Sequence, residues 1–114
     1  IMGDFNIAPS AKDVWNEEIM RNKVSFHPRE HEHLKAISET GLTDIFRKFN
    51  QKPGQFSWWD FRTRGFERGE GMRIDYILAN SFLTSSCLNC IIDFSAREQD
   101  RPSDHAPVIG EFNI

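Results

Sequence analysis

The chain has 114 residues, the length of one domain, and 39% of them are hydrophobic, which is enough to form a core. Its formal net charge of −3 gives no overall positive field to attract nucleic acid. The charge does not exclude a local nucleic-acid site at which a metal ion supplies the positive charge. It has no apolar run of the roughly 18 to 20 residues that a membrane span needs, no secretory signal pattern and no disulfide framework from its two cysteines. We therefore expect a cytoplasmic protein without a membrane partner.

The first five residues predict the end of a buried strand, and we expect that a segment preceding them is missing. Asp4 and Asn6 are two residues apart, so an extended backbone would place them on one side. Pro9 ends the strand. The pair would lie at the carboxyl end of a strand, where open α/β sheets hold their sites. A polar turn after a strand is the alternative interpretation.

Helical patterns follow. Ser10 with Asp13 predicts a capping box, and an apolar stripe continues that helix: Val14, Trp15, Ile19 and Met20. Pro28 predicts the first turn of a second helix that ends near Gly41. Its expected buried residues are Leu34 and Ile37. Three histidines near its start, His27, His31 and His33, favour a solvated face over a zinc site, because a closed zinc site needs four well-placed ligands. A third short helix is expected at residues 42–49, with Ile45, Phe46 and Phe49 turned inward.

Two strands are predicted at residues 56–62 and 73–79, joined as a hairpin by the glycine-rich loop 63–71. In the second strand Arg73 and Asp75 would share one side. An acid in a buried strand needs a partner, either a cation or a histidine. A plain salt bridge to an arginine remains the alternative.

Two more strands are expected at residues 87–94 and 105–114. On the first, Cys87 and Cys90 would point to opposite faces, so we expect buried, unreactive thiols. Asp104 and His105 precede the second strand, between two prolines that stiffen the backbone. Adjacent residues of an extended chain point to opposite sides, so the two side chains can serve different partners.

Three polar positions therefore stand out: Asp4 with Asn6, Asp75, and Asp104 with His105. Carboxylate and carboxamide oxygens suit Mg²⁺, a carboxylate can orient or deprotonate a water, and a histidine beside an acid can stabilise charge on a phosphate. This mixture favours metal-assisted phosphodiester hydrolysis. The hypothesis requires folding to gather the three positions into one cavity.

Four segments, residues 3–9, 56–62, 71–78 and 102–108, carry the motifs Gly-Asp-Phe-Asn-Ile-Ala-Pro, Phe-Ser-Trp-Trp-Asp-Phe-Arg, Gly-Met-Arg-Ile-Asp-Tyr-Ile-Leu and Pro-Ser-Asp-His-Ala-Pro-Val. In order and spacing they resemble the motifs of the exonuclease III and abasic-site endonuclease group of the endonuclease/exonuclease/phosphatase family. The resemblance covers essentially the whole chain.

The resemblance implies an α/β fold, half of a four-layer α/β sandwich, with one mostly antiparallel or mixed sheet and helices on its outer face. Residues 1–114 would be the C-terminal half of the domain, with the N-terminal half absent. That half carries the family's principal metal-binding glutamate and its catalytic tyrosine, and Tyr76 is not at the tyrosine's position. We therefore expect the fragment alone to be inactive and to self-associate through its exposed inner sheet face.

The resemblance also implies residue roles. Asp4 would activate the attacking water, Asn6 would hold the phosphate, Asp75 would pair with His105, and His105 would contact the phosphate. The metal, Mg²⁺ with Mn²⁺ as the alternative, would be held by Asp4, Asn6 and Asp104. A second set of residues would bind DNA: Trp58, Met72 and Ile74 as the wall of an apolar pocket for a flipped-out sugar, and Arg62 and Arg64 at phosphates.

The activity implied is that of an exodeoxyribonuclease III-like DNA repair nuclease, working as a 3′→5′ exonuclease and abasic-site endonuclease. Its partner would be double-stranded DNA with abasic sites or 3′ ends. One alternative is a non-catalytic relative that binds RNA or protein, but such a relative has no chemical reason to keep all five polar side chains. The other alternative is a phosphatase or sphingomyelinase of the same superfamily.

Overall fold

The computed structural model describes all 114 residues as a mixed α/β fold with three small antiparallel sheets. The strands of the sheets pair in the orders β1-β5-β2, β3-β4 and β6-β7. The strands are β1 (Met2–Asp4), β2 (Thr43–Asp44), β3 (Trp58–Trp59), β4 (Gly71–Met72), β5 (Asp75–Ala79), β6 (Cys87–Ile92) and β7 (Val108–Phe112). This architecture agrees with the predicted α/β class.

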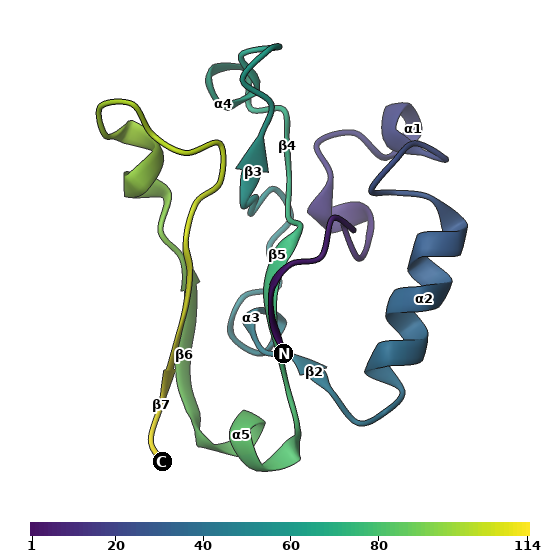
Figure 1. Cartoon of the computed structure of the whole chain (residues 1–114), viewed down its shortest axis with the longest axis vertical. Helices are drawn as coiled ribbons and strands as arrows, with labels where there is room; N and C mark the ends of the chain where they lie inside the picture. Colours follow the sequence, from purple (N-terminus) through teal and green to yellow (C-terminus); the bar gives the residue numbers. More distant parts are fainter.

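The helices are mostly short and lie in the connections between strands (Figure 1). They are the 3-10 helices η1 (Ala11–Asp13) and η2 (Phe94–Glu98), and the α-helices α1 (Glu17–Met20), α2 (Pro28–Ser38), α3 (Phe46–Phe49), α4 (Gly65–Arg68) and α5 (Ser81–Ser86). The longest, α2, has 11 residues. None of the helices has the length and hydropathy needed to cross a membrane.

Strand β5 is central, with α2 on one side and the β6–β7 hairpin on the other (Figure 1). Tyr76 and Leu78 of β5 form a core with Leu34 of α2. Ile77, which points the other way, packs with the largest core cluster, and a Cβ on Gly110 of β7 would lie 3.1 Å from its Cδ1. The alternation of β5 therefore joins the two cores, as a period of two dictates.

The predicted first helix is broken into η1 and α1. Val14 is extended, with φ −127° and ψ 150°, and forms an isolated bridge with Met72. This pairing buries Val14 and gives its backbone a sheet partner, whereas Ile19 is 45% exposed instead of packed. The Ser10–Asp13 capping box is present, and the Asp13 carboxylate accepts hydrogen bonds from the Ser10 backbone N–H and hydroxyl.

Helix α2 begins at Pro28 as predicted and buries Leu34, but Ile37 is 36% exposed. Gly41, with φ +99°, lies in the turn after the helix. The histidines near its start make structural contacts: His27 Nδ1 accepts a hydrogen bond from the Arg29 N–H, and His31 Nε2 lies 2.8 Å from the Ala8 carbonyl oxygen. The expected helix at 42–49 contains β2 before α3, and Phe49 is 40% exposed.

The predicted hairpin forms, but its strands are shorter than expected. Only Trp58–Trp59 and Gly71–Met72 pair, and the loop between them contains α4. Residues 73–74 lie between β4 and β5, and the Arg73 N–H donates to the Asp13 carbonyl, 2.8 Å away, beside the Val14–Met72 bridge. The predicted strand 73–79 therefore begins two residues late, at Asp75, and Arg73 lies outside it.

The expectation for the cysteines was half right. A bulge in β6 between Cys87 and Asn89 changes the register, and Cys87 and Cys90 are both buried as free thiols instead of lying on opposite faces. Burial, with the neighbouring Cys87, raises the pKa of Cys90 to about 12, as expected of an unreactive thiol. The expectation of a buried first strand was also wrong, since Met2 is 76% exposed on the edge strand β1.

Candidate active site

Three distant segments meet at one end of the central sheet. In the β1–β5 pairing Asp4 lies opposite Asp75. The segment before β7 pairs with β3, since Trp58 bridges to His105 and the Ala106 N–H donates to the Ser57 carbonyl. These backbone pairings bring the predicted acids and His105 together.

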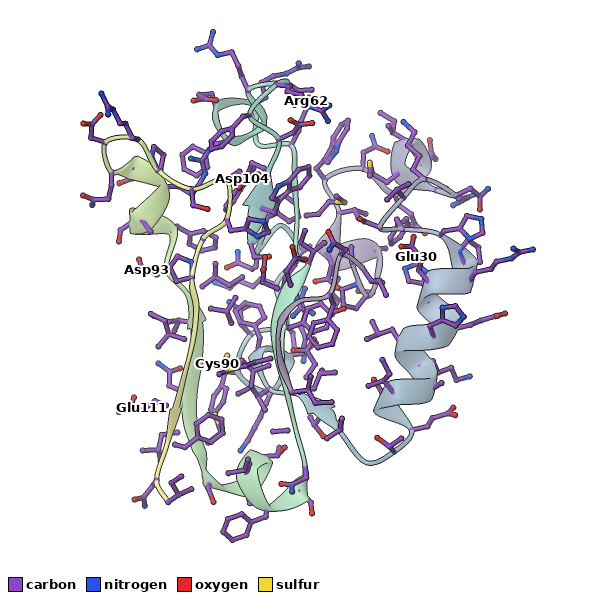
Figure 2. The ribbon with its side chains drawn as sticks, in the orientation of Figure 1. Glu30, Arg62, Cys90, Asp93, Asp104 and Glu111 are labelled. Atoms are coloured by element: carbon purple, nitrogen blue, oxygen red, sulfur yellow. The ribbon has the colours of Figure 1, made fainter.

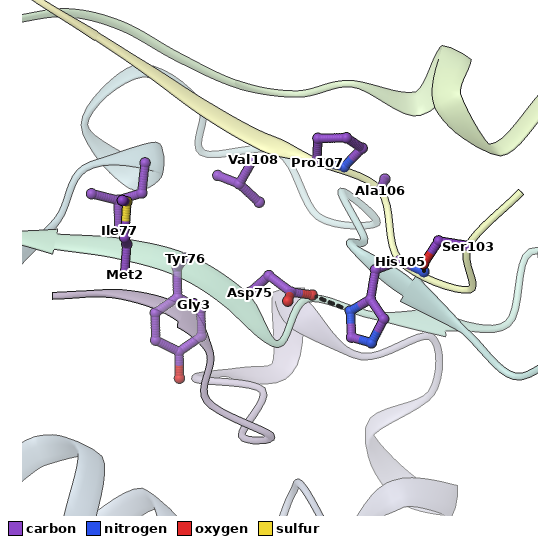
Figure 3. Close-up of a pocket in the computed structure, with 10 residues that line it drawn as sticks. All are labelled: Met2, Gly3, Asp75, Tyr76, Ile77, Ser103, His105, Ala106, Pro107 and Val108. Atoms are coloured by element: carbon purple, nitrogen blue, oxygen red, sulfur yellow. Dashed lines mark hydrogen bonds and ion pairs between the residues drawn. The ribbon is translucent and has the colours of Figure 1, made fainter.

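His105 is the centre of the cluster. Its Nδ1 lies 2.8 Å from Asp75 Oδ2, as drawn in Figure 3. Its Nε2 lies 3.8 Å from Asp4 Oδ2 and 3.9 Å from Asp104 Oδ1. One nitrogen therefore makes a fixed hydrogen bond, and the other faces two carboxylates at a distance that leaves room for a ligand.

The Asp75 carboxylate accepts hydrogen bonds from two side chains. Its Oδ2 accepts from the Ser57 hydroxyl at 2.8 Å as well as from His105. The Ser57 Oγ in turn accepts the backbone N–H groups of Ile74 and Asp75 at 3.0 Å, so its own hydrogen must point to the carboxylate. Burial raises the pKa of Asp75 above its ordinary value, although the hydrogen bonds from His105 and Ser57 act in the opposite direction.

The cluster suits a divalent cation. One ligand atom from each of Asp4, Asp75 and His105 can be chosen so that all lie within 4.8 Å of one another. Asp4 Oδ2 and Asp104 Oδ1 accept no hydrogen bond from the protein, whereas the second oxygen of each carboxylate does. Hard cations prefer such oxygens, so the donor set fits Mg²⁺ or Mn²⁺.

Asn6 is placed differently from the prediction. Its φ of +54° takes the backbone out of the extended region, so Asn6 lies in a turn after β1 and not on the extended strand that the prediction assumed. Its backbone N–H donates to Asp4 Oδ1 at 2.8 Å, and the residue is exposed. Asp4 is thus oriented by the turn that follows it.

The structure has two pockets, and one of them is lined by residues of the cluster. The smaller, of about 360 Å³, is lined by Asp75 and His105 together with residues of β1, β5 and β7 (Figure 3). The larger, of about 790 Å³, is lined by Trp58, Met72 and Arg62 among others. Ile74, the third residue predicted for a pocket wall, is only 3% exposed and lines neither pocket.

The predicted phosphate-binding arginines are on the surface. Arg62 is 88% exposed and pairs with Asp60, with its NH2 nitrogen 3.1 Å from Asp60 Oδ2. The hydrogen bonds that Arg62 donates to the Asp60 carboxylate raise the pKa of Arg62 above its usual value. Arg64 is exposed in a left-handed backbone conformation at the start of α4. Figure 2 shows Arg62 and Asp104 toward the end of the molecule opposite to Glu111.

Two features of the site were not predicted. Ser57 is completely buried and orients Asp75, and the Trp58 indole N–H donates to Asp104 Oδ2 at 3.0 Å. Both residues stand in an aromatic run that indicated a strand. The only signal in the sequence is that adjacent residues of a strand point to opposite faces, so Ser57 and Trp58 would contact different partners.

The chain matches the model of the Endonuclease/Exonuclease/phosphatase family over residues 1–105. It is 40% identical to exodeoxyribonuclease III of Haemophilus influenzae, over 98% of this chain and 45% of that protein. It is 33% identical to the exodeoxyribonuclease of Bacillus subtilis, over the whole of this chain and 44% of that protein. The chain thus spans somewhat less than half the length of these curated relatives.

Solved structures agree. The NExo 3′ phosphatase from Neisseria bound to a product DNA hairpin superposes with a TM-score of 0.95 at 34% identity, over 99% of this chain and 44% of that one. An AP endonuclease from Archaeoglobus fulgidus gives a TM-score of 0.93 at 35% identity, with the same coverage of 99% and 44%. On its sequence, its fold and the arrangement of its acids around a histidine, this chain belongs to the endonuclease/exonuclease/phosphatase family.

Proposed function

We propose that the protein carrying this chain is a DNA repair nuclease of the exodeoxyribonuclease III type, acting as a 3′→5′ exonuclease and an abasic-site endonuclease. The observation that carries the proposal is the contact of His105 with Asp75, with the free oxygens of Asp4 and Asp104 turned to the other imidazole nitrogen. The relatives named exodeoxyribonuclease and AP endonuclease support the substrate class. In this proposal residues 1–114 form the C-terminal half of the catalytic domain.

The metal proposed is Mg²⁺, with Mn²⁺ as a substitute, held by Asp4 and Asp104 and assisted by Asn6. Such an ion would neutralise charge on the phosphate and polarise its oxygens. The geometry supports this assignment because two carboxylate oxygens that accept no hydrogen bond from the protein face the same nitrogen of His105.

The chain's own residues would divide the remaining work. Ser57 and Asp75 fix the imidazole, so His105 presents one nitrogen to the phosphate in a constant direction. Asp4 is exposed and can accept a proton from, or orient, a water molecule. Trp58 and Met72, in the wall of the larger pocket, offer an apolar surface to a baseless sugar.

The single experiment is an incision assay with the full-length protein on a duplex that carries one abasic site, with Mg²⁺ and with EDTA. Asp4→Asn and His105→Ala should each lower the rate by about 10³-fold, the range of a lost proton-transfer or charge-stabilising group. Asp100→Asn and His33→Ala are matched controls, because both residues are exposed and neither contacts the cluster. Substantial incision by both site variants would overturn the assigned roles.

A second activity, removal of a 3′ phosphate, deserves the same assay because a close structural match is named a 3′ phosphatase. Both reactions break a phosphate ester and would use the same His105 and Asp4. A duplex ending in a 3′ phosphate separates the two candidates. Release of phosphate without incision at the abasic site would favour the phosphatase.

A further inference from the structure

Trp58 contacts two parts of the site at once. Its ring packs against the core cluster that contains Met72 and Ile74, and it lines the pocket of about 790 Å³. Its indole N–H donates to Asp104 Oδ2 at 3.0 Å. Phenylalanine could supply the same apolar wall, but it has no N–H group, so the hydrogen bond is a separate contribution of this side chain.

Asp104 accepts hydrogen bonds from both residues of β3, Trp58 and Trp59. Its backbone carbonyl accepts the Trp59 N–H at 3.1 Å, and its Oδ2 accepts the Trp58 indole. Its other oxygen, Oδ1, is left 3.9 Å from His105 Nε2. The carboxylate is 37% exposed, so without the indole it would be free to rotate toward water.

We propose that Trp58 is a positioning residue, whose indole N–H holds the Asp104 carboxylate with one oxygen directed at the cation position beside His105. The proposal rests on the proposed function, since it assigns Asp104 to the cation. It also gives one side chain two tasks, as a pocket wall and as a support for a metal ligand. Outer hydrogen bonds of this kind fix the orientation of ligands in metal sites.

Because Trp58 lines the larger pocket and also donates to Asp104, it connects the pocket to the cation position. A group that enters the larger pocket touches the Trp58 ring, and any displacement of that ring is transmitted to Asp104 through the hydrogen bond. Binding in the pocket and binding of the cation therefore influence each other, and the influence is equal in both directions. Trp58→Phe should remove the link and keep the wall.

The first test measures binding of Mn²⁺ to the full-length protein without DNA, by the loss of the electron paramagnetic resonance signal of the free ion. Trp58→Phe should weaken Mn²⁺ binding about 10-fold, the lower part of the range for lost outer hydrogen bonds. Trp15→Phe is the matched control, because Trp15 lines the same pocket without a hydrogen bond to a carboxylate. Equal Mn²⁺ affinity in Trp58→Phe and the unsubstituted protein would overturn the proposal.

The second test asks whether the effect passes through Asp104. In the Asp104→Asn background, Trp58→Phe should produce less than about a twofold further change in Mn²⁺ affinity, because neighbours that act together are not additive. In nitrogen-15 spectra the indole N–H signal that disappears in Trp58→Phe should shift in Asp104→Asn. An unshifted signal would show that the contact is absent and would contradict the proposal.

These experiments distinguish the positioning role of Trp58 from the proposed nuclease function. If the unsubstituted protein incises DNA and binds Mn²⁺, but Trp58→Phe binds Mn²⁺ with unchanged affinity, the positioning role is contradicted and the nuclease function is not. Failure of the unsubstituted protein to bind Mn²⁺ would contradict both, whereas failure to incise the duplex with Mn²⁺ bound would contradict the nuclease function alone. A 10-fold effect that vanishes in the Asp104→Asn background supports both.

Discussion

The ion pairs around Arg73 and the acids around His105 use the same kinds of residue, and Arg73 is only two residues from Asp75. Arg73 is 1% exposed; its Nε lies 2.7 Å from Asp13 Oδ1 and its NH2 2.6 Å from Asp44 Oδ2. Arg47 adds a second contact to Asp13 at 2.6 Å. The acids around His105 are less buried, since the side chains of Asp4 and Asp104 are each 37% exposed and that of Asp75 is 18% exposed.

The two clusters differ in charge balance. Around Arg73, two acids face two arginines, and both oxygens of Asp13 and of Asp44 accept hydrogen bonds. Around His105, three acids face one imidazole, and Asp4 Oδ2 and Asp104 Oδ1 are left over. A balanced buried cluster holds the fold together, whereas an unbalanced exposed one is suited to a cation from solution.

The largest expected effect on stability comes from the balanced cluster. Asp13→Asn should lower the free energy of unfolding by about 3 kcal/mol, because it leaves the buried Arg73 guanidinium with one acid in place of two. Urea unfolding at pH 7 measures the loss. Asp4→Asn is the comparison variant: it should lower activity and leave unfolding nearly unchanged, since Asp4 is exposed.

The pH dependence of stability tests the same ion pair, Asp13 with Arg73. Burial acts to raise the pKa of Asp13, but Arg73 and Arg47 outweigh it and hold that pKa below its ordinary value of 3.8. The stability from Asp13 is therefore present above about pH 3.8 and is lost as the pH falls through the lowered value. The gap between the native protein and Asp13→Asn should accordingly shrink below pH 3.8. A gap that stays constant down to pH 2.5 would contradict the ion-pair explanation.

Ser57 gives the next effect, because it belongs to the unbalanced cluster and is nevertheless buried. Ser57→Ala removes the acceptor of two backbone N–H groups and the donor to Asp75. We expect a loss of about 2 kcal/mol in unfolding free energy, the cost of unpaired buried groups, with a roughly 10-fold fall in incision from the freed Asp75. Ser95→Ala, which removes an exposed hydroxyl bonded to Asp93, should change neither quantity.

Some of this site could be predicted from the sequence because it depends on local order. Asp4, Asp75, Asp104 and His105 each stand at or beside a strand end: Asp4 ends β1, Asp75 begins β5, which pairs with β1, and Asp104 and His105 precede β7. Helix α2 was predictable from Pro28 and Leu34 for the same reason, since caps and period are local signals.

The rest depends on contacts between distant residues. Arg73 lies outside the strand, and its guanidinium contacts Asp13 and Asp44, which are 60 and 29 residues away along the chain. Val14 leaves its helix to pair with Met72. Ser57 reaches Asp75 only after β3 and β4 have paired. No pattern within one segment contains these partners, so helix and strand periodicity could not show them.

Arg62 gives the smallest effect and extends the comparison to the surface. Like Arg73, Arg62 forms an ion pair, in this case with Asp60. The Arg62 side chain is 88% exposed, and an exposed ion pair contributes little to stability. Arg62→Gln should therefore leave unfolding unchanged and weaken binding of duplex DNA by a few-fold, with a salt slope lower by about one. Lys35→Gln is the control, since Lys35 pairs with Glu39 on α2 in a similar exposed position. If both variants bind DNA with the native salt slope, Arg62 does not contact phosphate, and the pocket beside it must hold its ligand through Trp58 and Met72 without that charge.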